Sequence, residues 1–172
     1  MNNTVLKYGI YSFTLATILF STALYFGYAL AFKTHGIIGY LTIVASLFFV
    51  YFGVKHYKNY DLNGEITFKK AAAIGIGIAA YAAFAFGLID AIYITSIHPN
   101  FAQSYIDYEF AILEAQKLTE AELYLDQLAV VKQSEVFENP IIVFFVMLMV
   151  VLVIGTVISL LSAMKLYNLQ EE

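Results

Sequence analysis

The chain has 172 residues, of which 61% are hydrophobic and only 13% are charged. A soluble domain is about half apolar and about a quarter charged, so this surplus of apolar side chains indicates a protein that is solvated partly by a lipid bilayer. The lack of cysteine excludes disulfides, thiolate metal sites and a cysteine nucleophile, and the scattered lysines exclude a clustered basic surface for nucleic acid.

Four continuous apolar segments are each long enough to cross a membrane, for which a helix needs about 20 residues. Because backbone groups in lipid must be hydrogen-bonded within their own segment, each is expected to be an α-helix. The sequence therefore predicts an all-α protein, a single membrane domain over residues 1–172 built as a four-helix bundle. The expected spans cover approximately residues 8–32, 37–57, 68–97 and 140–167.

The lysines predict the orientation of these spans. With four spans, both termini share one side of the membrane with the loop that follows the second span. That side holds six lysines and the other side three, and a lysine excess near span ends marks the cytoplasm. We therefore expect both termini to be cytoplasmic. The six are Lys7, Lys55, Lys58, Lys69, Lys70 and Lys165, against Lys33, Lys117 and Lys132.

The connection between the third and fourth spans is expected to be a periplasmic helical hairpin over residues 99–138. Thr119 and Glu122 have the spacing of a capping box that starts its second helix. Asn139 followed by Pro140 predicts the N-cap and first position of the fourth span. The hairpin carries eight acidic residues and two lysines. It could be a lid packed on the bundle or a docking surface for a partner.

The third span contains small residues at strict intervals of four, which predict a surface for close helix packing. The pattern leaves open whether the partner helix is in the same chain or in a second copy. The stripe consists of Ala71, Gly75, Ala79, Ala83, Gly87 and Ala91.

One carboxylate, Asp90, interrupts the same apolar segment near its outer end. Charged groups inside spans are costly, so they face the bundle and find partners. Thr42 and Tyr25 are expected at the same depth, which predicts either a buried polar anchor between helices or a proton or cation site. The first span adds a polar stripe that either bonds neighbouring helices or lines a wet path, composed of Thr14, Thr17, Ser21, Tyr25 and Tyr28.

No pattern of catalytic chemistry is present. The chain has no glycine-rich phosphate loop and no convincing Ser-His-Asp order. Its three histidines fall at span ends, without the facing pair that a bis-histidine haem requires. We therefore expect no catalytic residues, no bound metal and no cofactor.

Short stretches distributed in order along the chain resemble a known family. They are "KYGI", "FFVYFGVKHYKN", "NGEITFKKAAAIG", "HPNFAQSY", "ENP" and "GTVISLLSA". The chain is similar to the bacterial membrane proteins of domain-of-unknown-function family 4199. The resemblance implies a membrane protein and is silent on activity. The family pattern carries an acid and a proline ahead of the glycine in the fourth span, and "VMLMVVLVIG" here contains neither.

These observations predict an integral membrane protein, not an enzyme. The expected role is a non-enzymatic accessory or scaffold subunit that packs through its third span, with the lipid bilayer and another membrane protein or a second copy as partners. The alternative is a small oligomeric transporter or channel that uses Asp90 and the first-span hydroxyls. Conduction would require a continuous polar path, whereas a dry bundle would favour the scaffold.

Overall fold

A computed structural model describes residues 2–27, 32–116 and 118–168 of the chain. These residues are almost entirely helical and form no strand, so the predicted all-helical class is confirmed. In chain order the elements are α1 (Asn2–Gly27), α2 (Phe32–Ser46), α3 (Phe48–His56), η1 (Tyr57–Asp61), α4 (Phe68–Ile92), η2 (Tyr93–Ile97), α5 (Phe101–Glu114), α6 (Glu120–Ser134), η3 (Glu135–Glu138) and α7 (Pro140–Asn168).

Four helical stretches are long and apolar enough to cross a membrane, as predicted. The second stretch joins α2, α3 and η1, and the third joins α4 and η2. The third and fourth stretches have the bounds expected from sequence, whereas the first and second begin a few residues earlier. The four are Asn3–Gly27, Thr34–Asp61, Phe68–Ile97 and Pro140–Tyr167.

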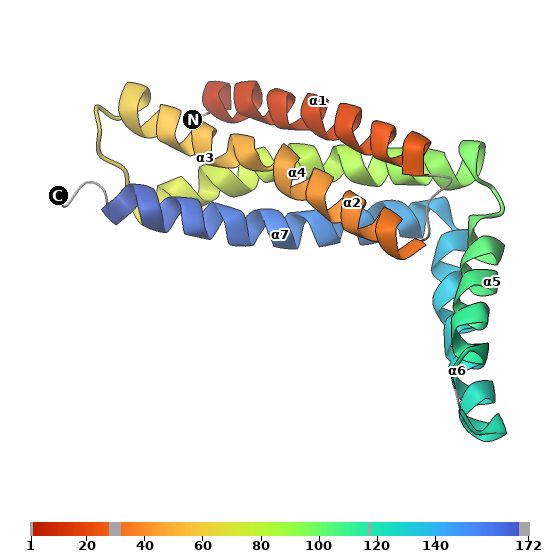
Figure 1. The fold of residues 1–172 in the computed structure, drawn as a ribbon. Helices are drawn as coiled ribbons and strands as arrows, with labels where there is room; N and C mark the ends of the chain where they lie inside the picture. The colour runs from red at the N-terminus through yellow and green to blue at the C-terminus, as the bar shows by residue number, and fades with distance from the viewer. Residues whose placement is uncertain (1, 28–31, 117, 169–172) are drawn as a thin grey trace.

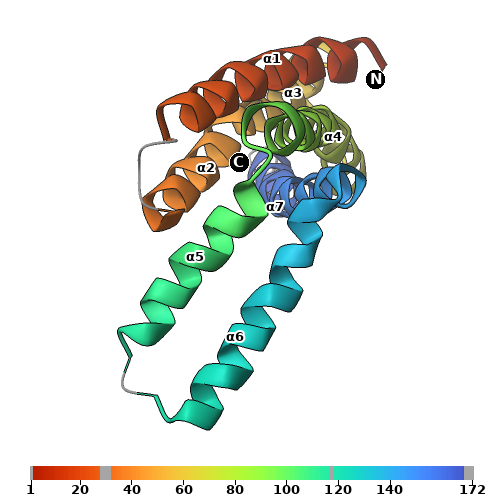
Figure 2. The same cartoon turned by 90° about the vertical axis from the view of Figure 1, so that its right-hand side faces the viewer.

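The helices lie side by side in an elongated bundle with two different ends (Figure 1). The first residues of α1 and the last of α7 lie together at one end, here named the terminal end. The other end carries α5 and α6, and is named the hairpin end. The hairpin runs across the bundle axis and projects sideways beyond the bundle (Figures 1 and 2).

The α4 helix is the centre of the fold and contacts α1, α3 and α7. Its small residues allow the backbones of α4 and α7 to approach closely. A Cβ atom added at Gly87 would lie 2.7 Å from the carbonyl oxygen of Phe144 in α7, and one added at Gly75 would lie 2.7 Å from the Ser159 side chain. The close packing that the stripe predicts is therefore made within one chain, against α7.

A break divides the second stretch at Leu47. The Ser12 hydroxyl on α1 donates to the Ser46 carbonyl over 2.8 Å, and the Val50 amide donates to Leu47, three residues back. A side chain inserted into the helical hydrogen-bond ladder is a known cause of a kink. The Ser12 contact therefore explains why α2 and α3 are separate helices.

A buried lysine joins the second stretch to α7 at the terminal end. The Lys58 ammonium donates to the Leu166 carbonyl over 2.9 Å, and its side chain is buried. Leu166 lies in the last turn of α7, where the helix dipole favours a cation. The Thr4 hydroxyl also donates to Asp61 over 2.9 Å, which ties α1 to η1.

The caps predicted for the hairpin region are confirmed. The Thr119 side chain accepts from the Glu122 amide, and the Glu122 carboxylate accepts from the Thr119 amide over 2.9 Å, which completes the capping box. These hydrogen bonds from Thr119 lower the pKa of Glu122 below its usual value. Asn139 Oδ1 accepts from the Ile141 amide over 3.0 Å and so caps α7.

Candidate functional site

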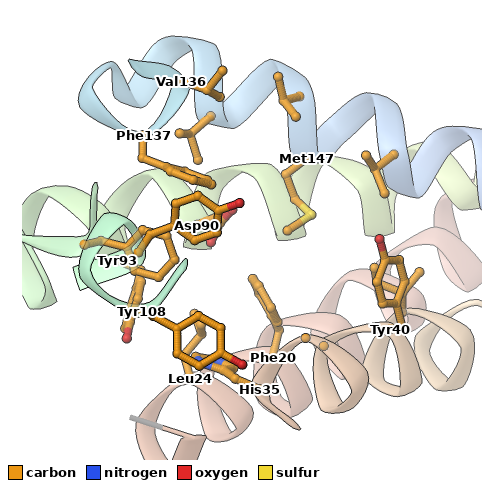
Figure 3. Close-up of a pocket in the computed structure, with 18 of the residues that line it drawn as sticks. Phe20, Leu24, His35, Tyr40, Asp90, Tyr93, Tyr108, Val136, Phe137 and Met147 are labelled. Atoms are coloured by element: carbon orange, nitrogen blue, oxygen red, sulfur yellow. The ribbon is translucent and has the colours of Figure 1, made fainter. Parts of the chain in front are cut away.

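The hairpin end encloses a cavity of about 580 Å³. This volume falls within the roughly 300–1,000 Å³ of small-molecule sites. Its walls come from α1, α2, α4 and α7, and α5 covers it from the side of the hairpin (Figure 3). Because so many elements of the fold meet around this one space, we take this cavity as the candidate site.

The position of α2 makes room for the cavity. The α2 helix contacts α1 and α3, whereas α7 is held mainly by α3 and α4. Gly36 and Gly39 lie on the α2 wall, and a Cβ atom added at either would meet no other atom within 4 Å. We infer that the break at Leu47 leaves a space between α2 and α7. Because Gly36 and Gly39 have no side chains, α2 does not fill this space at those positions.

The lining of the cavity is mostly aromatic and aliphatic. Phe20 of α1 packs on Phe86 of α4 with 4.7 Å between ring centroids, and both side chains are buried. Met147 faces them from α7, and Phe137 and Val136 of η3 lie toward the hairpin (Figure 3). Such a lining suits a hydrocarbon and gives little support to a purely polar ligand.

Asp90 places a carboxylate on this apolar wall (Figure 3). Its side chain is partly buried, and it has no hydrogen-bond or ion-pair partner among the described residues. A carboxylate removed from water costs free energy unless a donor or cation meets it. Asp90 is therefore a carboxylate of the cavity that lacks a partner among the described residues.

The hairpin contributes further polar groups above Asp90. Tyr105, Tyr108 and Glu109 of α5 line the cavity, as does His35 of α2. Burial, and after it the neighbouring Glu109 carboxylate, raises the pKa of the Tyr105 hydroxyl. Apart from His35, the lining contains no basic side chain among the described residues. The polar part of the cavity is therefore acidic.

The partners predicted for Asp90 lie elsewhere. The Thr42 hydroxyl is buried but donates to the Gly39 carbonyl of its own helix over 2.7 Å. The Tyr25 side chain is 77% exposed and packs on Phe26. The structure thus does not bring Thr42 and Tyr25 onto Asp90 as an anchor. Hydroxyls within helices commonly bond a carbonyl three or four residues back, which sequence spacing does not distinguish from a contact between helices.

The first-span hydroxyls line a different space from Asp90. Thr17, Ser21 and Tyr25 lie on a groove of about 710 Å³ between α1 and the end of the third stretch. Thr14 is exposed, and Tyr28 lies outside the described residues. The polar stripe of α1 and the carboxylate of α4 therefore do not share one path.

The small-residue stripe of α4 is buried against α7 within the same chain. Five of its six members are buried and Ala91, nearest the hairpin end, is partly exposed. A Cβ atom added at Gly155 of α7 would lie 2.5 Å from that of Ala79, so the fit between these helices is close from both sides. The stripe is thus occupied by α7 and is not free to bind a second copy.

Comparison with known proteins places the chain in a family. A family model described as "Protein of unknown function (DUF4199)" matches residues 7–166, which is nearly the whole chain. The chain therefore belongs to the DUF4199 family, as its sequence motifs predict. No curated protein and no solved structure matches it.

Proposed function

We propose that this member of the DUF4199 family is a multi-pass protein of the bacterial inner membrane that acts as a non-enzymatic accessory subunit. Both termini face the cytoplasm and the α5–α6 hairpin faces the periplasm. Four membrane-length helices support the location, and the excess of lysines at the terminal end supports the orientation. The cavity, with its apolar lining and unpartnered carboxylate, supports binding more than catalysis.

Single cysteines test the orientation, because the chain has none of its own. Glu65 and Gln116 are both exposed, at the terminal end and in the hairpin respectively. A membrane-impermeant thiol reagent applied to spheroplasts is expected to label Gln116→Cys and to leave Glu65→Cys unlabelled until lysis. Labelling of Glu65→Cys before lysis would reverse the orientation.

An exposed apolar stripe on α6 is the observation that carries the accessory role. Tyr124, Leu128 and Val131 follow helical spacing and remain exposed, with Leu125 beside them 64% exposed. Among the residues of α6, only Ser134 is buried. The stripe therefore contributes little to the fold, and apolar surface of this kind marks interaction sites.

The chemistry of the hairpin indicates the kind of partner. Acidic residues outnumber lysines by eight to two over residues 99–138. An apolar stripe flanked by carboxylates is complementary to an apolar surface with a basic rim. Because the hairpin projects beyond the bundle, such a surface would belong to a neighbouring membrane protein (Figure 2).

Site-specific photo-crosslinking tests this role. A photoreactive amino acid at Leu128 is expected to form a discrete adduct with another membrane protein in native cells, and the adduct should be lost when Leu125→Asp is added. The matched control is the same amino acid at Asp126, an exposed α6 residue on the opposite face of the helix from Leu128. Adducts only between copies of this chain, or equal adducts at both positions, would contradict a separate partner.

The arrangement gives less support to a transporter. The half of the bundle toward the terminal end is filled by fully buried Leu47, Val50, Ile74 and Ile78. Gly75 and Gly155 lie in close contact with their neighbours in the same region. The cavity thus reaches only part of the way along the bundle, and a continuous polar path is not formed among the described residues.

A further inference from the structure

The cavity is open toward the membrane as well as covered by the hairpin. Tyr40 of α2 and Val146 of α7 both line it, and they are 60% and 47% exposed, so the space between α2 and α7 is not closed. Both helices belong to membrane-length stretches, so this opening would face the bilayer. If this apolar space stayed empty, the side chains that line it would lose dispersion contacts. We therefore expect hydrocarbon from the neighbouring lipid to occupy it.

The depth of the cavity matches one leaflet. Its wall on α7 extends to Val150, ten residues from Pro140, which is about 15 Å at ~1.5 Å per residue. The hydrocarbon core of a bilayer is about 30 Å thick, so the cavity ends near its middle. Asp90 lies seven residues before Ile97, about 10 Å below the hairpin end on the same scale.

The polar part of the cavity selects the head group of an occupant. Asp90 and Glu109 are carboxylates, and the lining includes no lysine among the described residues. A head group with a net negative charge would be repelled, whereas a primary ammonium group would supply the cation and the hydrogen-bond donors that Asp90 lacks among the described residues. The tyrosine hydroxyls of α5 add further hydrogen-bonding groups nearby.

We propose that the cavity binds a zwitterionic membrane lipid with a primary ammonium head group, which enters between α2 and α7 from the leaflet at the hairpin end. One acyl chain fills the apolar space between α2 and α7, and the ammonium group lies between Asp90 and Glu109 under α5. One ligand thus fills the space and partners Asp90. The proposal needs a membrane location but is independent of the partner suggested for α6.

Lipid photolabelling of the whole protein tests this site. The protein is placed in phosphatidylcholine nanodiscs with a trace of phosphatidylethanolamine that carries a diazirine on one acyl chain. After irradiation, adducts are expected in peptides that contain residues 36–43 and 143–150. The same diazirine chain on phosphatidylcholine or phosphatidylglycerol is expected to label these peptides about tenfold less, since hydrogen bonds between charged groups are among the strong ones.

Two variants separate the roles of space and charge. Gly39→Leu fills the cavity from a position with open space around it, and Asp90→Asn removes the charge while keeping the shape. Each is expected to lower labelling about tenfold with its helical content and thermal unfolding close to the parent's. The matched control is Ala45→Leu, which adds the same side chain at an exposed α2 position outside the cavity.

Four results would overturn the proposal. Equal labelling by the three head groups would remove the role of the carboxylates, and adducts spread evenly over all four spans would indicate ordinary annular lipid. Unchanged labelling in folded Gly39→Leu protein would place the lipid outside the cavity. If both variants lose fold, unlabelled phosphatidylethanolamine should still compete with the probe on the parent protein better than phosphatidylglycerol does, and equal competition would overturn the proposal.

Discussion

Gly87→Leu is expected to destabilise the protein more than any other single change to the small-residue stripe. The new Cβ atom would lie only 2.7 Å from the carbonyl oxygen of Phe144, which is closer than real Cβ contacts allow. This oxygen belongs to the backbone of α7, so the two helices must separate, and overpacking costs typically 1–3 kcal/mol and sometimes more. We expect a loss of about 3 kcal/mol or more, which corresponds to a melting temperature lowered by roughly 10 °C in detergent.

The control for this change is Ala80→Leu, on the same helix. Ala80 is exposed, so an added side chain meets lipid or detergent and not α7. Its thermal unfolding should stay close to the parent's, because volume added on a surface disturbs no packing. Equal melting temperatures for the two variants would show that contact between α4 and α7 is not what holds the bundle together.

Lys58→Met is expected to be the most damaging change at the terminal end. Methionine keeps the apolar stem of the lysine and its packing but removes the ammonium group that donates to Leu166. Hydrogen bonds to charged groups contribute about 1.5–3 kcal/mol, and this cation also lies at the negative end of the α7 dipole. The melting temperature should fall by roughly 4–10 °C.

Lys55→Met provides the matched comparison, because Lys55 lies one turn earlier on the same stretch and is exposed. Its loss should leave thermal unfolding nearly unchanged. If the two methionine variants unfold at the same temperature, the contact between Lys58 and Leu166 contributes nothing to stability. Hydrogen exchange of the last turn of α7 gives a second measurement, since only Lys58→Met should increase it.

Sequence patterns predict the elements of this fold well because each depends on local chemistry. The fourth stretch begins at the proline that predicts its start, and the Asn139 and Thr119 caps form the hydrogen bonds that their spacing predicts. These contacts span three residues or fewer. Nothing farther along the chain can change them easily, and a bilayer leaves the helix as the only structure for such segments.

The candidate site could be predicted only in part. Asp90 is conspicuous in the sequence as an acid in an apolar segment, and it does lie on the cavity. Depth along the spans predicts Thr42 and Tyr25 as its neighbours, but Thr42 donates to Gly39 and Tyr25 packs on Phe26. Depth along a span follows from counting residues, but the direction in which a side chain points depends on how each helix is rotated in the bundle.

Composition and period by themselves determine that this chain is helical, that four of its segments can cross a membrane, and that α4 presents a surface of small residues. Tertiary structure alone decides that α7 covers that surface, that Lys58 caps α7 from 108 residues away, and that the Ser12 hydroxyl separates α2 from α3. The physical reason is the distance along the chain over which each interaction acts. Hydrophobicity and capping act within a few residues, whereas the cavity exists only because four distant helices and the hairpin meet around it.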